Sequence, residues 1–326
     1  MIYIQSKTGG RTENQDFYGS AQTKYGEIII VCDGMGGHNG GRHAAETAVQ
    51  TIIEEVSNSR EGNPVNVLRD AIIKANTAIW EEGHADKSLK GMGTTVVALL
   101  ISPVKAISFH VGDSRIYQLR DGKILFRTFD HSHVFEMVKA GLITEEQARL
   151  SEKSNIITRG LGIQSTVDVS ITDSLPYKKG DRFLLCTDGI CGAVPENELV
   201  DMASQNDNIE KLLPQLVEKI DAIGFEDGGK HDNLTVALLE MESDSIFNQV
   251  EKKVVNKSSK TGKSSSKLLI YFLLIALSGS MALNLYLLST KKQEIKKVET
   301  KISKKQSPKK DSKIADTTNA TIPDKK

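Results

Sequence analysis

The chain has 326 residues and 39% hydrophobic residues, enough for one large domain or two modest ones with a buried core. Its formal net charge of zero hides a division, because residues 243–326 hold 18 Lys against 7 acidic residues and leave 24 basic against 35 acidic residues in 1–242. An acidic domain repels phosphate backbones, so we expect no nucleic-acid partner. The 3 cysteines form no C-x-x-C pair, which argues against a disulfide framework or zinc knuckle and fits a reducing compartment.

The hydrophobic pattern of residues 1–242 predicts a mixture of strands and helices. The expected strands are Glu27–Cys32, Thr94–Ile101, Ala106–Val111, Ile116–Leu119, Phe183–Cys186 and Leu234–Met241. The expected helices are Gly41–Ser57, Pro64–Glu82, His133–Ala140, Glu196–Ser204 and Asn208–Ile223. Two long helices follow each other early in the chain, which argues against a strictly alternating strand–helix fold.

Several expected strands are apolar on both faces, as in "EIIIVC" and "TTVVALLI". Such strands need cover on both sides. Two mainly antiparallel sheets packed on each other, with helices outside, would provide it, so we predict an α+β, four-layer α-β-β-α sandwich for residues 1–242.

Four aspartates share one context at the ends of apolar strands. Asp33 follows "IIIVC", Asp188 follows "FLLCT", Asp113 lies in "FHVGDSR", and Asp232 comes just before the last expected strand. Each of Asp33 and Asp188 is followed by glycine, which permits close approach of the main chain. Strand ends that converge would gather these carboxylates in one acidic pocket. Hard divalent cations prefer such oxygen ligands, and they would offset the repulsion between the charges.

The C-terminal part has a different organisation. We expect a Lys- and Ser-rich linker at 243–267, a transmembrane helix at Leu268–Leu288 and a disordered Lys-rich tail at 289–326. The 21 uncharged residues of the helix span about 31 Å, which matches a hydrocarbon core of about 30 Å.

The motifs of residues 1–242 together resemble the metal-dependent serine/threonine protein phosphatases of type 2C, most closely the bacterial members. The resemblance is carried by "RTENQD" (11–16), "VCDGMGGHNGG" (31–41), "GTT" (93–95), "VGDSR" (111–115), "CTDG" (186–189) and "HDNLTV" (231–236). It implies a β-sandwich flanked by helices, with two Mn²⁺ or Mg²⁺ ions at one end.

The resemblance also implies roles for individual residues. Asp33 would bridge both ions, the Gly34 carbonyl would bind one, and Asp188 and Asp232 would hold the second. Asp113, with Asp188, matches a third-metal site of bacterial relatives. Arg11 matches the arginine that binds the substrate phosphate, and Asp16 matches a carboxylate that orients metal-bound water. A metal-bridged hydroxide would then attack phosphoserine or phosphothreonine in line, without a covalent intermediate.

Two segments depart from the family pattern. Met35 stands where animal relatives carry a histidine thought to protonate the leaving oxygen, so metal-bound water would take that role here. In the flap segment, Phe129–Gly162, the chain reads Ser151-Glu152-Lys153-Ser154-Asn155 where bacterial members usually have His-Pro and an arginine before the asparagine. Docking of substrate over the flap is therefore expected to differ.

The resemblance and the apolar segment together predict a membrane-anchored protein phosphatase, and the resemblance implies a Ser/Thr kinase whose action it would reverse. The alternatives are a catalytically silent sensing module with the same fold and a hydrolase of small phosphate esters. No secretory signal is visible at "MIYIQSKTGGR", so we expect the catalytic domain to stay on the cytoplasmic side of the inner membrane. The charge rule does not decide this orientation, because six lysines in 251–267 face five in 289–303 across the apolar segment.

Overall fold

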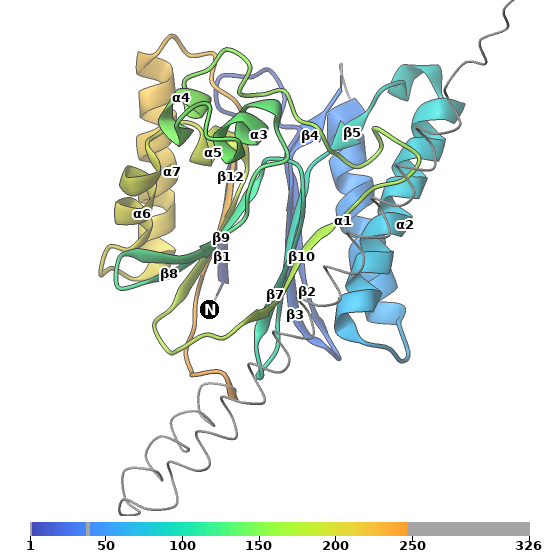
Figure 1. Ribbon diagram of the computed structural model, residues 1–326, viewed down its shortest axis with the longest axis horizontal. Helices are drawn as coiled ribbons and strands as arrows, with labels where there is room; N and C mark the ends of the chain where they lie inside the picture. Colours follow the sequence, from blue (N-terminus) through green and yellow to red (C-terminus); the bar gives the residue numbers. More distant parts are fainter. Residues whose placement is uncertain (1, 37–39, 247–326) are drawn as a thin grey trace, which may run out of the picture. The chain divides into compact units, whose positions relative to one another are not determined.

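The computed structural model describes residues 2–36 and 40–246, which form two five-stranded sheets packed face to face (Figure 1). One sheet has the order β1-β12-β11-β8-β9 and the other β10-β7-β6-β3-β2; neighbouring strands are antiparallel. The strands of the first sheet are β1 (Ile2–Lys7), β8 (Arg115–Arg120), β9 (Lys123–Arg127), β11 (Arg182–Cys186) and β12 (Leu234–Glu240). Those of the second are β2 (Phe17–Thr23), β3 (Gly26–Cys32), β6 (Val96–Ile101), β7 (Ala106–Val111) and β10 (Ser170–Leu175). A two-residue ladder joins β4 (Gly34–Met35) to β5 (Gly93–Thr94).

Helices cover the outer faces of both sheets. The helices α1 (Gly40–Asn58) and α2 (Pro64–Ala85) lie over the β2–β3–β6–β7 side, while α6 (Glu196–Ala203) and α7 (Ile209–Glu226) lie over the β11–β12 side (Figure 1). Asn63 caps α2 by accepting a hydrogen bond from the Val65 amide, and Pro64 occupies the first turn, where no amide donor is needed. The predicted order of layers, α-β-β-α, is therefore confirmed for the described residues.

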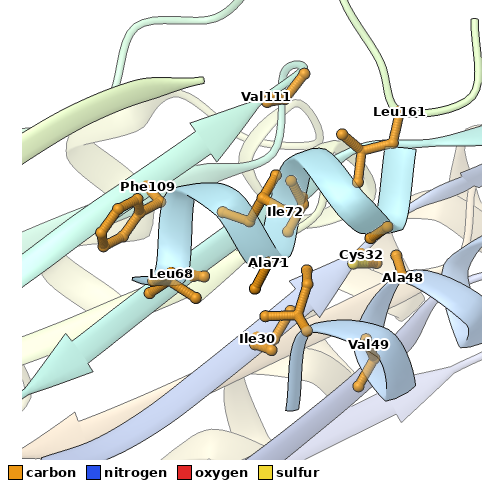
Figure 2. Packing of buried hydrophobic residues seen from close by; sticks show 14 of the residues in the cluster. Ile30, Cys32, Ala48, Val49, Leu68, Ala71, Ile72, Phe109, Val111 and Leu161 are labelled. Carbon is orange, nitrogen blue, oxygen red and sulfur yellow. The ribbon is translucent and has the colours of Figure 1, made fainter. Parts of the chain in front are cut away.

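The central strand β3 shows why its sequence is apolar throughout. Ile28, Ile30 and Cys32 point toward α1 and α2, where Figure 2 shows Ile30 and Cys32 near Ala48, Ala71 and Ile72. Ile29 and Val31 point the other way, into the core between the sheets. Because side chains alternate along a strand, a strand buried on both faces carries no polar position. All five residues are fully buried.

Within the described residues, the structure adds five strands that the hydrophobic pattern missed: the two-residue strand β4 and the edge strands β1, β2, β9 and β10. The sequences of β2, "FYGSAQT", and β10, "SITDSL", are rich in small and polar residues because these strands lie at sheet edges and are only partly buried. The expected strand Thr94–Ile101 is two strands, β5 and β6, interrupted at Thr95. The five expected helices are present, and none of their ends differs from the prediction by more than three residues.

The described fold runs a few residues beyond Glu242. Ser245 is buried and its amide donates to the Tyr177 carbonyl oxygen at 2.9 Å, while the Ile246 amide donates to the Pro103 carbonyl oxygen at 2.8 Å. Among the residues the structure describes, no helix combines the length and apolar character needed to cross a bilayer. The predicted transmembrane segment 268–288, the tail 289–326 and the linker beyond residue 246 lie outside the described residues.

Candidate metal and phosphate site

A cavity of about 410 Å³ opens at the end of the sandwich where several strands stop. Asp33 follows β3, Asp188 begins the short helix α5 (Asp188–Cys191) after β11, and Asp113 lies in the turn between β7 and β8. Asp232 precedes β12 and Arg11 follows β1. These five side chains and Gly34 all line the cavity, so the predicted convergence of the strand ends is confirmed.

The backbone of Asp33 is fixed by two threonines from the β5–β6 junction. The Asp33 amide donates to Thr95 Oγ1 at 3.0 Å, and the Asp33 carbonyl oxygen accepts from the Thr95 amide at 2.9 Å and from Thr94 Oγ1 at 2.8 Å. Thr95 Oγ1 in turn contacts Ser114 Oγ at 2.7 Å, next to Asp113. The two threonines of "GTT", where the strand is interrupted, therefore fix the backbone of Asp33 and connect it through Ser114 to the turn that carries Asp113.

The glycines beside Asp33 and Asp188 allow backbone segments to approach each other. A Cβ at Gly34 would lie 2.1 Å from the Gly41 carbonyl oxygen, and one at Gly189 would lie 2.1 Å from the Asn233 carbonyl oxygen. Real Cβ atoms do not come so close, and the obstacle is backbone that cannot rotate away. We expected these glycines to let the main chain approach a ligand; the structure shows that they also let protein strands meet around the carboxylates.

The carboxylates of the cavity raise one another's pKa. Burial and then the charges of Asp188, Asp16, Asp113 and Asp232 hold the pKa of Asp33 well above its ordinary value. Burial and the charge of Asp188 do the same to the pKa of Asp113, and burial and the charge of Asp232 raise the pKa of Asp188. Carboxylates buried so close together are not stable as a set of bare anions. A bound cation would compensate their negative charges.

The donor set suits a hard divalent ion, although it does not form a closed cage. Asp188 Oδ1 is buried and has no hydrogen-bond partner among the described residues. No three His, Cys, Asp or Glu side chains within residues 2–36 and 40–246 are grouped tightly enough to hold a metal on their own. Mg²⁺ and Mn²⁺ sites commonly use one or two carboxylates and complete the shell with water and phosphate oxygens, so the arrangement fits such ions.

Asp16 differs from the other predicted site residues because it lies beneath the cavity, almost fully buried. Its Oδ2 accepts from Thr187 Oγ1 at 3.0 Å, and its Oδ1 is buried without a partner. Burial raises the pKa of Asp16 to about 7, with hydrogen bonds from Thr235 and Thr187 opposing the shift and the charge of Asp188 adding to it. Asp16 is therefore placed to act through its neighbours.

Arg11 is held at the cavity rim by an ion pair with Asp232, with 2.7 Å between Nη2 and Oδ2. The residue that organises this rim is Asn233 of "HDNLTV", for which the sequence pattern indicated no role. Its Oδ1 accepts from the Gln15 amide at 2.8 Å, and its Nδ2 donates to the Thr8 and Glu13 carbonyl oxygens. Asn233 thereby fixes the loop that carries Arg11 against the segment that carries Asp232, just before β12.

His131 braces the Asp113 loop from behind. Its Nδ1 accepts from the Gly112 amide at 3.1 Å, its own amide donates to the Gly112 carbonyl oxygen at 2.9 Å, and its ring stacks on His110. Because Nδ1 accepts, Nε2 carries the proton and donates to Ser170 Oγ at 2.9 Å. Burial, followed by the charge of His110, lowers the pKa of His131 to about 3, so the ring stays neutral. The spacing of the histidines in sequence held no hint of this pairing.

The flap segment closes one wall of the site. Asn155 and Ile157 line the cavity, and the first flap helix, α3 (His133–Lys139), is anchored through Arg115. The guanidinium of Arg115 forms two hydrogen bonds of 2.7 Å with Asp130 and lies over the Phe135 ring. Arg115 of "GDSR" therefore ties the flap to the strand that follows Asp113.

Comparisons with known proteins agree with this geometry. A family model described as protein phosphatase 2C matches residues 6–224. The serine/threonine phosphatase stp of Listeria welshimeri is 34% identical over 235 residues, which cover 71% of this chain and 91% of the relative. Protein phosphatase PhpP of Streptococcus pneumoniae is 33% identical over 239 residues, covering 72% of this chain and 94% of the relative.

Solved structures give the same result for the fold. The crystal structure of the serine/threonine phosphatase Stp1 from Staphylococcus aureus matches with a TM-score of 0.67 and 28% identity over 74% of this chain and 95% of that one. The catalytic domain of the serine/threonine protein phosphatase PstP, in complex with 2 manganese ions, matches with a TM-score of 0.62 and 27% identity over 74% and 97%. On the match to the family model and on these relatives, the chain belongs to the type 2C family of serine/threonine protein phosphatases.

Proposed function

We propose that the chain hydrolyses phosphoserine and phosphothreonine in proteins at the carboxylate cavity, in a reaction that depends on Mn²⁺ or Mg²⁺. The observation that carries the proposal is the convergence of Asp33, Asp113, Asp188 and Asp232 with Arg11 on one cavity. The carboxylates supply oxygen ligands for cations, and the arginine supplies a donor for phosphate.

Asp33, Asp188, Asp232 and the Gly34 carbonyl would hold two ions, with Asp113 and Asp188 available to a third. Such ions would supply Lewis acidity toward phosphoryl oxygens and toward water. The buried, unpartnered Asp188 Oδ1 and the raised pKa values of Asp33 and Asp188 support this assignment, because a bound cation would relieve both.

Arg11 would orient the substrate phosphate. Its side chain is half exposed at the rim and already pairs with a carboxylate oxygen of Asp232, so it can exchange that partner for a phosphate oxygen once a cation neutralises Asp232. Asp16 is buried next to the cavity, where its carboxylate accepts a hydrogen bond from Thr187 Oγ1 at 3.0 Å, and it would orient water at the cations.

The test is phosphate release from a phosphothreonine peptide by the full chain, purified in mild detergent, with Mn²⁺ and with a chelator. We expect release only with metal. If Asp33→Asn no longer releases phosphate while the exposed control Asp201→Asn keeps full activity, the hydrolysis takes place at the carboxylate cavity. A silent sensing module would bind Mn²⁺ and release nothing. A small-ester hydrolase would cleave p-nitrophenyl phosphate and leave the peptide intact.

We further propose that the segment 268–288 anchors the enzyme in the inner membrane, with the catalytic domain in the cytoplasm. The support is the length of this uncharged segment and the basic residues on both sides of it. The lysines of the linker would lie against anionic lipid, each worth about 1 kcal/mol near the surface, and would hold an acidic domain close to the membrane.

Labelling of intact cells tests the orientation. A single cysteine introduced at Ser307, in a chain whose native cysteines are replaced, should react with a membrane-impermeant reagent. Reaction only after lysis would place both ends inside and overturn the proposed orientation. A Ser/Thr kinase is the proposed counterpart of the enzyme, because phosphoserine and phosphothreonine in proteins arise by transfer of a phosphoryl group to those hydroxyls.

A further inference from the structure

A second cavity, of about 280 Å³, adjoins the carboxylate cavity. The two cavities share five lining residues, Arg11, Asp113, Asn155, Asp188 and Asp232, so a molecule whose phosphate lies in the first can extend into the second. The second cavity is bounded on one side by the flap helices α3 and α4 (Glu145–Arg149) and on the other by the loop between α7 and β12.

Four apolar residues among those that line this cavity form what we call its floor. Val134, Phe135, Ala148 and Cys191 line it, and each is at most 5% exposed. These side chains come from α3, α4 and α5, so the floor is built by the flap and by the helix that starts at Asp188. Such a surface suits a stretch of polypeptide better than a free phosphate or a small polar ester.

The acidic residues that line the cavity have partners or proposed partners. Asp130 is paired with Arg115 through two hydrogen bonds, and Asp232 is paired with Arg11. Asp113 and Asp188 are proposed to face cations. Two cationic residues, Arg149 and Lys230, remain among the lining residues.

Arg149 and Lys230 differ in their own partners. The Arg149 guanidinium donates to both carboxylate oxygens of Glu146 and to the Gly192 carbonyl oxygen, so its charge is partly satisfied. Lys230 makes no hydrogen bond or ion pair with another side chain in the described part of the chain. Its ammonium group is the cation that is free to meet a ligand.

The backbone holds Lys230 at the rim. Gly228 and Gly229, just before it, have φ of 103° and 67°, a conformation that favours glycine. The Gly229 amide donates to the Gly224 carbonyl oxygen at 2.9 Å, and the His231 carbonyl oxygen, just after Lys230, accepts from the Gly10 amide at 3.1 Å. Lys230 therefore lies between two anchored residues, on the loop that also carries Asp232.

We infer that the second cavity receives the residues flanking the phosphorylated Ser or Thr, and that Lys230 selects substrates with an acidic side chain there; this inference rests on the proposed function. The domain as a whole is acidic, with 35 acidic against 24 basic residues in 1–242, so it repels acidic peptides in general. Lys230, a cation without a side-chain partner among the described residues, gives such peptides a place next to the phosphate position where their charge is matched.

Matched phosphothreonine peptides test the inference. Glu, Gln or Lys is placed in turn at each of three positions on either side of the phosphothreonine, and kcat/KM is measured with the full chain and Mn²⁺. We expect Glu to exceed Lys by about three- to tenfold at one or more positions, in line with an exposed charge pair. The preference should shrink as salt rises, since exposed charges are screened.

Charge reversal assigns the preference to a residue. Lys230→Glu should abolish or invert the Glu-over-Lys ratio, and Lys230→Gln should fall between. Lys211→Glu is the matched control. Lys211 is exposed near the start of α7, about 15 residues and roughly 22 Å from the end of the helix that leads into the Lys230 loop. It should leave the ratio unchanged.

The outcomes separate the inference from the proposed function. Equal kcat/KM for all peptides, or the same ratio in the Lys230→Glu and Lys211→Glu variants, would overturn the inference while peptide hydrolysis itself upheld the proposed function. Absence of Mn²⁺-dependent hydrolysis of any phosphopeptide would overturn both. p-Nitrophenyl phosphate, which has no flanking residues, normalises each variant for the amount of active enzyme.

Discussion

The bodies of the central strands and the ends of the same strands are opposite environments. Residues 28–32 of β3 and 183–186 of β11 are at most 1% exposed and almost entirely hydrocarbon, yet Asp33 follows β3 directly and Asp188 follows β11 after one residue. Burial of apolar surface stabilises the fold by about 25 cal/mol per Å², whereas burial of neighbouring charges destabilises it. The apolar burial within the sandwich thus offsets the free energy that is lost by holding Asp33 and Asp188 close together at its end.

This contrast indicates that folding and cation binding are linked. The strand ends are rigid because the core behind them is packed, and the packed core forces the carboxylates together. Any ligand that binds only the folded state adds to stability, and a cation at these carboxylates would also remove their repulsion. Replacing a carboxylate at the strand ends should therefore lower activity and stabilise the metal-free protein. Replacing a core side chain should lower stability and leave the activity of the folded molecules nearly unchanged.

The largest effect is expected from Asp33→Asn, which breaks the charged end. Phosphatase activity should fall by about three orders of magnitude or more, because a predicted bridging ligand is lost. The metal-free protein should at the same time become more stable, by on the order of 1 to 3 kcal/mol, because a carboxylate whose pKa is raised by burial and by Asp188 no longer has to be held there. Kinetics and thermal unfolding with and without Mn²⁺ measure both. Near-normal turnover would contradict the assigned site.

Phe183→Ala breaks the other side of the comparison. Phe183 is fully buried between the sheets, with its ring edge-on to Tyr177 at a centroid distance of 6.5 Å. The free energy of unfolding should drop by about 3 to 5 kcal/mol. The activity of the molecules that remain folded should stay within about twofold of the original. Leu142→Ala, at a residue that is 69% exposed, is the control for denaturant unfolding. An equal loss of unfolding free energy in Phe183→Ala and Leu142→Ala would show that the core between the sheets is not what stabilises the fold.

Asp113→Ala should have a smaller effect that sharpens the division within the charged end. Its carboxylate is linked to the rest of the site mainly through Asp188, so a third ion there would be weakly held and mostly hydrated. Turnover should fall about tenfold while tight Mn²⁺ binding at the other carboxylates persists. Titration calorimetry and kcat distinguish these. Loss of all tight binding would mean that Asp113 belongs to the main metal centre.

The smallest effect concerns His131, at the border between core and site. Its pKa of about 3 in the folded state lies below that of an ordinary histidine, near 6.5, so between these values only the unfolded chain takes up the proton. The stability that the neutral ring contributes is present above pH 6.5 and is lost as the pH falls toward 3. His131→Asn keeps an acceptor for the Gly112 amide but cannot titrate.

We therefore expect His131→Asn to cost on the order of 1 kcal/mol at pH 7.5 and less, or nothing, at pH 5. Urea unfolding at both pH values measures the difference between variant and original. His43→Asn, which removes an exposed pair with Glu82, is the control. Its stability difference from the original protein should not become smaller at pH 5. A difference that stays constant between the two pH values would mean that His131 does not titrate as its burial implies.

The sequence alone was sufficient for the features that depend on neighbouring residues. Alternation, helical periodicity and glycines placed after strands predicted the five helices, the central strands, the four-layer order and the gathering of Asp33, Asp113, Asp188 and Asp232. These signals are local, because a residue's burial within a strand or helix is set by its position in the repeat. The edge strands were missed because half-exposed strands need no apolar repeat.

Tertiary structure alone decided the features that join distant segments. The pairing of Arg11 with Asp232 links residues 221 positions apart, and Thr187 reaches Asp16 across 171. The placement of Asp16 below the cavity, the brace of His131 behind Gly112 and the position of Lys230 beside the flap likewise follow from which sheet edges and loops meet. No repeat along the chain encodes these contacts, because they depend on how the two sheets pack against each other.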